Sequence, residues 1–258
     1  MAEPGAYQRH VRLLVSIVLS MTKNDIYFMP ANNYSTSLQA LEDHTAGFFL
    51  QTQDVCRRMY GIGIFEVEKR RALERLHKEG ADDDIAGLIE LLNGFDEYFT
   101  TSSCSGRIIL ICIPEVGAKE EAEFIAKWHR KVGKDEVLKA IGMWKDADDA
   151  DGELWLMSQS PILHVSCVSI EKAKQLLSLA IESGFKYSGI KSITMRRVMV
   201  EIMSTERMDV PVGKEGVIFC SEPYLDFIVS SANFMLERGK EKLRRFYYSL
   251  ENKRRLKD

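Results

Sequence analysis

The 258-residue sequence lacks the short motifs that mark several large classes of protein. No two of its five cysteines form a Cys-x-x-Cys pair, and their number is odd, which argues against a zinc ribbon and a disulfide framework. No Gly-x-x-x-x-Gly-Lys-Ser/Thr sequence is present, so a P-loop is excluded. No Gly-rich turn follows a first strand, as a conventional Rossmann fold requires. We therefore expect no zinc and no conventional nucleotide-binding domain.

Long apolar runs are also missing. The longest candidate, Leu13–Met21, has nine residues and follows Arg9 and Arg12, as the core of a signal peptide does. However, Lys23–Asp25 follows without a small-residue cleavage site, and spanning a bilayer takes roughly 20 apolar residues. The sequence predicts no membrane span, and the free cysteines favour the reducing cytoplasm.

The net charge is small, but the charged residues are unevenly distributed. The net charge is only -3, which gives no global sign of a polyanionic partner. Residues 237–258 nevertheless contain nine Lys and Arg residues against four acidic ones, with Tyr247 and Tyr248 among them. Cations interspersed with aromatic rings suit contacts with RNA, but a solvated outer helix face has the same composition.

Hydrophobic patterning predicts an α+β protein, because helices and strands mix without regular β-α-β alternation. Helices are predicted over Phe65–Lys78, from a cap at Asp82–Asp84 through Leu92, over Glu121–Lys131, over Asp135–Trp144, from Ser169 to Gly184 and over Glu222–Asn252. Strands are predicted over Tyr98–Thr101, Ile108–Ile113, Leu154–Met157, Ile162–Val168, Ser192–Met203 and Val217–Phe219. We expect mixed sheets with flanking helices in two interwoven halves.

The chain changes character near Gly61 and Gly63. Residues 1–60 are irregular, whereas periodic patterns begin directly afterwards. We expect residues 61–258 to form one domain. Residues 1–60 are then either a poorly defined N-terminal extension or lie upstream of a start near Met59.

The polar segment Ser102–Arg107 is the best local candidate for a binding site. It is expected to be a turn between two strands, and it combines three hydroxyls, a thiol, a glycine and a guanidinium. Such a turn can hold an anion or a carboxylate, although a plain polar hairpin is the alternative. Within it, Cys104 is either a nucleophile or a small buried side chain.

Two histidines stand in well-patterned surroundings. His164 lies in an apolar strand, where it is either functional or a hydrogen-bonded core residue, and His129 lies in a predicted helix. His164 and Cys167 are three residues apart, so on a strand they point to opposite faces and cannot share one metal ion.

The segment from Tyr98 to Ile108 resembles the signature of the tRNA wybutosine-synthesising protein 3 family. Further similar strings follow in the family's order across about 190 residues: His129 with Lys134–Val137, Ile162–Val165 with Cys167, Ala180–Ile190, Ser204-Thr205 with Val210–Val212, Tyr224–Phe227 with Ala232-Asn233, and Lys242–Tyr247.

This resemblance implies an S-adenosyl-L-methionine-dependent methyltransferase. It would act on a ring nitrogen of the 4-demethylwyosine-type base on the 3′ side of the anticodon in tRNA(Phe). The resemblance implies three groups of site residues: catalytic His129, His164 and Cys104; cofactor-binding Ser102, Ser103, Gly106, Arg107, Ser188 and Gly189; and substrate-binding Asn233, Arg244, Arg245 and Tyr247. The alternatives are a non-catalytic tRNA-binding module of the same fold and a thiol-based redox enzyme centred on Cys104.

Overall fold

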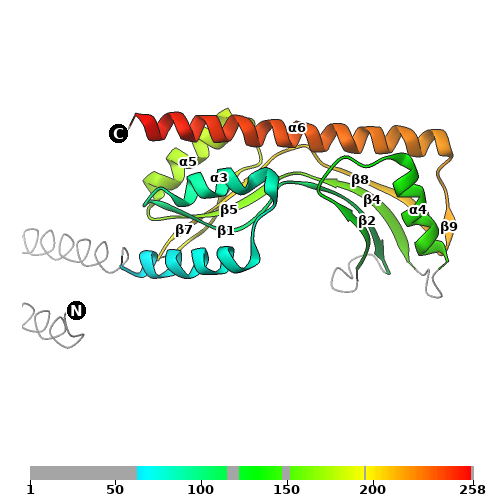
Figure 1. The fold of residues 1–258 in the computed structure, drawn as a ribbon, viewed down its shortest axis with the longest axis horizontal. Helices are drawn as coiled ribbons and strands as arrows, with labels where there is room; N and C mark the ends of the chain where they lie inside the picture. Colours follow the sequence, from blue (N-terminus) through cyan, green and yellow to red (C-terminus); the bar gives the residue numbers. More distant parts are fainter. Residues whose placement is uncertain (1–62, 115–121, 147–151, 195, 257–258) are drawn as a thin grey trace, which may run out of the picture. The chain divides into compact units, whose positions relative to one another are not determined.

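The computed structural model describes residues 63–114, 122–146, 152–194 and 196–256, and these form two antiparallel sheets (Figure 1). The four strands of the first sheet, in spatial order, are β1 (Tyr98–Cys104), β5 (Ile162–Cys167), β7 (Val198–Met203) and β6 (Gly189–Ile193). The five of the second are β3 (Glu123–Trp128), β2 (Arg107–Ile113), β4 (Glu153–Gln159), β8 (Met208–Lys214) and β9 (Val217–Ile218). The predicted α+β class is confirmed.

The chain crosses between the sheets three times. It passes from β1 to β2, returns from β4 to β5, and passes again from β7 to β8. Each sheet is therefore assembled from segments that alternate along the sequence. This arrangement confirms the prediction of two interwoven halves.

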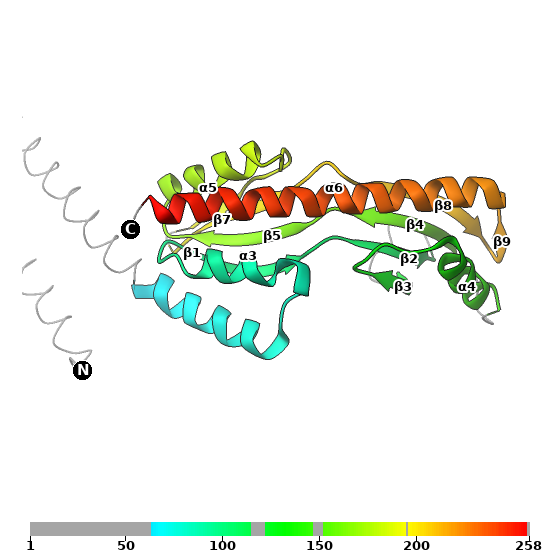
Figure 2. The same cartoon turned by 45° about the horizontal axis from the view of Figure 1, so that its top comes forward.

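Helices cover one face of both sheets. Figures 1 and 2 show α6 (Glu222–Arg255) lying along both sheets, with α3 (Asp83–Asn93) and α5 (Ile170–Glu182) beside it on the first and α4 (Lys134–Lys145) beside the second. The helix over residues 63–79 instead packs on the opposite face of the first sheet, where Phe65 meets Phe99 with ring centroids 4.9 Å apart.

The helix α6 takes part in two hydrophobic cores. Its N-terminal half packs on the second sheet through Leu225, Ile228, Val229, Ala232 and Leu236, and its C-terminal half packs on the first through Leu243, Phe246 and Leu250. All eight side chains are buried, as the helical spacing predicts. No described helix is long and apolar enough to cross a membrane, and the Leu13–Met21 run lies outside the described residues.

Several local predictions are wrong. Residues 123–128 of the predicted helix Glu121–Lys131 form the strand β3, which pairs with β2, while Glu121 lies outside the described residues. The predicted strand Ser192–Met203 is part of the hairpin of β6 and β7. The segment Ser102–Arg107 is no hairpin turn either: β1 continues to Cys104, β2 begins at Arg107, and the two strands pair in different sheets.

Gly239 lies where α6 crosses the connection from β4 to β5. A Cβ at this position would lie 2.5 Å from Cδ of Pro161, so even a methyl group forces the helix and the crossover apart. We expect Gly239→Ala to lower the free energy of unfolding by about 1–2 kcal/mol, because overpacking outweighs a helix-propensity gain of up to about 1 kcal/mol.

Gly142 in α4 is the matched control for that substitution. Nothing lies within 4 Å of a Cβ built there, so Gly142→Ala is expected to stabilise the protein by about 1 kcal/mol. Urea denaturation of both variants measures the opposite signs. A stabilising Gly239→Ala would show that α6 does not press on Pro161.

Candidate active site

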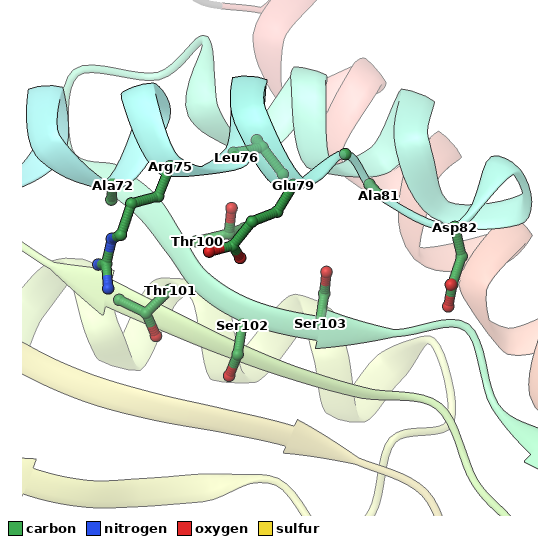
Figure 3. A pocket seen from close by; sticks show the side chains of 11 residues that line it. Ala72, Arg75, Leu76, Glu79, Ala81, Asp82, Thr100, Thr101, Ser102 and Ser103 are labelled. Atoms are coloured by element: carbon green, nitrogen blue, oxygen red, sulfur yellow. The ribbon is translucent and has the colours of Figure 1, made fainter.

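A cavity of about 380 Å³ runs along the free edge of β1. Figure 3 shows it between this strand and the end of the helix over residues 63–79, with the segment Gly80–Asp82 closing one side. Its polar lining consists of Arg75, Glu79, Asp82, Thr100, Thr101, Ser102 and Ser103. The volume lies within the range of small-molecule sites, and the lining offers one guanidinium, two carboxylates and four hydroxyls.

His164 is held next to this cavity by Ser102. The Nε2 atom of His164 lies 3.0 Å from Oε2 of Glu201, and its Nδ1 atom lies 2.9 Å from Oγ of Ser102. A carboxylate only accepts hydrogen bonds, so the Nε2–H group of His164 donates to Glu201, while Nδ1 and the Ser102 hydroxyl share the second hydrogen bond. These residues face each other on β1, β5 and β7 through the register of the sheet.

Glu201 stays ionised beside His164. Burial alone raises the pKa of its carboxyl, but hydrogen bonds from Lys191 and His164 outweigh burial and hold the pKa below its ordinary value. The Nζ atom of Lys191 lies 2.6 Å from Oε1 of Glu201. Both ring nitrogens of His164 therefore have fixed partners, and the ring can pass a proton only through the Ser102 hydroxyl.

His129 is held by Asp82, another residue of the cavity lining. Its Nδ1 atom lies 3.1 Å from Oδ2 of Asp82, and this oxygen also accepts hydrogen bonds from the backbone N–H and the hydroxyl of Ser105, at 2.9 and 3.0 Å. Burial raises the pKa of Asp82, but the Ser105 bonds and His129 outweigh burial and lower it below the ordinary value. Within the described residues, Nε2 of His129 has no partner and can accept a proton.

Cys104 adjoins His129, with Sγ 4.0 Å from its Nδ1 atom. Burial is the main cause that raises the pKa of this thiol, and the Asp82 carboxylate raises it further. The atoms of Asp82, Cys104 and His129 lie within 4.8 Å of one another, close enough to consider a metal ion. The retained thiol proton and the three hydrogen bonds at Asp82 favour a hydrogen-bonded cluster, and they argue against a nucleophilic thiolate.

Arg107 lies outside this cavity, at the start of β2. Its Nε atom donates to Oε1 of Gln159 at 2.6 Å, and its guanidinium carbon lies 5.4 Å from the ring centroid of Phe124. Both partners belong to the second sheet. The guanidinium is thus fixed on the face of that sheet that α4 and α6 leave open.

Three predicted cofactor residues lie away from the cavity. Gly106, with φ of +92°, is buried between the crossovers, and a Cβ there would come within 3.2 Å of Leu236 and Pro161. Ser188 accepts a hydrogen bond from the backbone of Met203, and Gly189 begins β6, the edge strand farthest from β1. These three residues do not line the cavity, and their predicted contact with a cofactor stays a prediction.

The predicted substrate contacts on α6 stay predictions, and the structure shows where these residues lie. The amide of Asn233 exchanges two hydrogen bonds with the backbone of Val132, of 2.9 and 2.8 Å, which fix its orientation. Arg244 and Arg245 are exposed and form no ion pair within the described residues, whereas Tyr247 is partly buried against the first core. This helix covers the face of the first sheet opposite the helix over residues 63–79 (Figure 1).

Sequence patterns missed several residues that shape the site. Asp82 is the N-cap of α3, as predicted, but its side chain makes no capping bond and turns to Ser105 and His129 instead. Arg75 and Glu79 look like the solvated side of a helix. Glu201 carried the clearest signal, a lone carboxylate in the apolar strand β7.

Comparisons with known proteins agree on one family. The family model described as Methyltransferase TYW3 matches residues 66–252. A protein from Thermococcus sibiricus is 47% identical over 185 residues, covering 70% of this chain and 91% of the relative. A Pyrococcus horikoshii protein is also 47% identical over 185 residues, covering 70% and 92%. Both are named as methyltransferases acting on N(4) of 7-(3-amino-3-carboxypropyl)-4-demethylwyosine(37) in tRNA(Phe).

Solved structures show the same fold. The PH1069 protein from Pyrococcus horikoshii superposes with a TM-score of 0.68 at 46% identity, covering 73% of this chain and 97% of that one. A hypothetical protein from Aeropyrum pernix does so with a TM-score of 0.57 at 31% identity, covering 66% and 98%.

Proposed function

Because the chain belongs to the TYW3 methyltransferase family, we propose that it methylates N4 of the 7-(3-amino-3-carboxypropyl)-4-demethylwyosine base at position 37 of tRNA(Phe). This enzyme class confirms the methyltransferase prediction made from the sequence. In this proposal the reaction takes place next to the anticodon of tRNA(Phe), and the protein acts in the cytoplasm. Residues 61–258 form the catalytic domain in this proposal.

The observation that carries the proposal is that two residues of the cavity lining each hold an imidazole. Ser102 contacts His164, and Asp82 contacts His129. A ring nitrogen that still carries its proton is a poor nucleophile, so methyl transfer needs a base close to the acceptor. Two oriented histidines beside one small-molecule cavity suit that requirement.

The cavity lining fits S-adenosyl-L-methionine, which supplies an electrophilic methyl group when bound. Arg75 matches a carboxylate, Glu79 matches an amino group, and the hydroxyls of Ser102 and Ser103 match polar groups of a nucleoside. The outward-facing peptide groups of the edge strand β1 add donors and acceptors along the same wall.

His129 is the general base in this proposal. Asp82 fixes the ring by accepting a hydrogen bond from Nδ1–H. This leaves Nε2 to take the proton from the ring nitrogen of the tRNA base. Ser102, His164 and Glu201 form a hydrogen-bonded row that positions the cavity wall. Cys104 stays a thiol and packs beside His129, so the thiol-based redox alternative has no support from its pKa.

Radioactive methyl transfer tests the function. The full chain is incubated with tritiated S-adenosyl-L-methionine and tRNA from cells that lack this modification step. We expect label in tRNA(Phe) at position 37. A gel shift without label would identify a non-catalytic tRNA-binding module, and no effect of the cofactor on any activity would contradict the proposal.

Arg75 provides a separate test of the cofactor site. We expect Arg75→Ala to weaken S-adenosyl-L-methionine binding by about tenfold or more, because a charged hydrogen bond contributes about 1.5–3 kcal/mol. Arg70→Ala on the same helix is the control, since Arg70 does not line the cavity. Calorimetry with S-adenosyl-L-methionine and no RNA measures the cofactor affinity of both variants. Equal affinities would place the cofactor elsewhere.

A further inference from the structure

The open face of the second sheet carries two aromatic rings in one row. Phe124 on β3 and Trp155 on β4 both lie opposite Ile111 of β2, so all three side chains point to the same face. Strands lie about 4.8 Å apart, which places the two rings about 10 Å from each other. Phe124 is 45% exposed, and Trp155 is partly exposed.

The adjacent rows add cations to this face. Lys127 and Met157 lie opposite Ile109, and Arg107 lies opposite Gln159. The Nζ atom of Lys127 lies 4.7 Å from the ring centroid of Phe124, and the guanidinium of Arg107 approaches the same ring. Neither cation forms an ion pair with a described carboxylate. Positive charge and aromatic surface therefore coincide.

None of the described helices packs on this face. The helices α4 and α6 bury the other side of β2, where Ile108 and Leu110 belong to the second core. On the open side, Ile109 and Ile111 are still nearly inaccessible to solvent. The surface available to a partner is therefore aromatic and cationic around Phe124. The carboxylates of Glu153 and Asp209 lie on the same face near Trp155 and Met157, where they pair with Lys214 and Arg207.

We propose that this face binds single-stranded nucleotides of the anticodon loop by stacking bases on Phe124 and Trp155. The inference rests on the proposed function, since it takes tRNA as the substrate. Stacking on aromatic side chains of a sheet is a frequent way to hold unpaired RNA bases, and Arg and Lys beside the rings neutralise the phosphates. The face adjoins the sheet crossover from β1 to β2, and so leads toward the cavity.

The test compares alanine variants at the two rings. We expect Phe124→Ala and Trp155→Ala each to raise the Kd for an anticodon stem–loop RNA by about tenfold, in line with the effect of losing one stacked base. Fluorescence anisotropy with labelled RNA measures the Kd, and calorimetry with S-adenosyl-L-methionine is expected to show unchanged cofactor affinity. Trp155→Phe keeps a ring and is expected to retain RNA affinity, which separates stacking from misfolding.

A matched control lies on the helical side of the molecule. Phe234 of α6 is 62% exposed, so Phe234→Ala removes a ring that is more accessible than Phe124 and is expected to leave the Kd unchanged. Lys127→Ala is expected to reduce the slope of log Kd against log salt concentration by about one, as loss of one phosphate contact does.

The possible results separate this inference from the proposed function. If both alanine variants bind RNA like the wild type while the wild type still transfers methyl groups, the stacking face is refuted and the function stands. A wild-type protein that dimerises through this face, with Trp155→Ala monomeric and RNA affinity intact, also overturns the inference. If the wild type transfers no methyl group, the proposed function itself fails.

Discussion

Replacing His129 with alanine is expected to lower kcat for methyl transfer by about 10²- to 10⁴-fold, the usual contribution of a general base. Asp82 lines the cavity and fixes the ring of His129, whose Nε2 atom has no partner within the described residues. The RNA and cofactor affinities are expected to stay within about threefold, since the ring contributes proton transfer and not binding. Single-turnover methyl transfer with saturating tRNA measures the loss directly.

Two other histidine variants make this result specific. His77→Ala is the control, because His77 is an exposed residue that does not line the cavity. His164→Ala tests the competing assignment, in which Ser102 relays the proton. A larger loss of kcat in His164→Ala than in His129→Ala, or an unchanged kcat in His129→Ala, would transfer the role of the base to the Ser102–His164 pair.

Lys242→Met is expected to lower the free energy of unfolding by about 3 kcal/mol, because removal of one partner leaves the other charge buried without compensation. The ammonium group of Lys242 reaches from α6 to the carboxylate of Glu206 in the connection from β7 to β8. Their side chains are only 7% and 12% exposed, so solvent screens the pair little. Urea denaturation at pH 7 measures the change.

The acid dependence of stability gives a second readout for this pair. Burial raises the pKa of Glu206, but the hydrogen bond and the charge of Lys242 outweigh burial and hold the pKa below its ordinary value. A depressed carboxyl pKa stabilises the fold above the unfolded pKa, and this contribution disappears as the pH falls through the folded pKa. Lys242→Met is expected to remove that part of the acid sensitivity.

Arg244→Ala is the control, because this neighbouring exposed cation forms no described ion pair, and the change should stay within about 0.5 kcal/mol. The double variant Lys242→Met with Glu206→Leu is expected to recover much of the lost stability, since both charges are then absent. Equal stabilities of Lys242→Met and the wild type would show that the Glu206 carboxylate becomes hydrated when Lys242 is removed.

The helices with strong periodicity could be predicted from the sequence. In α6, eight apolar residues at helical spacing are all buried, and in α5 the cap Ser169 accepts from the backbone N–H of Lys172 as expected. These features depend on neighbours within a few residues. Such local interactions are present in the sequence itself.

Strand β3 shows why other parts could not be predicted. Residues 123–128 have alanine, glutamate and lysine at spacings that suit a helix, yet pairing with β2 decides their structure. The sequence predicts a turn at Ser102 and Ser103 because both residues are polar. They belong to a strand whose polar side chains border a cavity, and a strand of this kind lacks the apolar alternation of a half-buried strand.

The candidate site was predictable only in its residue types. The family resemblance brought Ser102, His129 and His164 together as a set. Their division into two clusters follows from the register of β1 with β5 and β7, which places Ser102 beside His164 and Glu201 beyond it. Arg75 and Asp82 enter the site from a different helix and its cap, and no local pattern marks such a meeting.

The three crossovers bear on how the protein folds during synthesis. β1 pairs with β5, β2 pairs with β4, and both sheets still require strands that are made after residue 198. Pairings this distant in sequence make folding slow and leave strand edges unpaired until late. Because α6 completes both cores, the nascent chain is expected to stay protease-sensitive until its last 34 helical residues have left the ribosome.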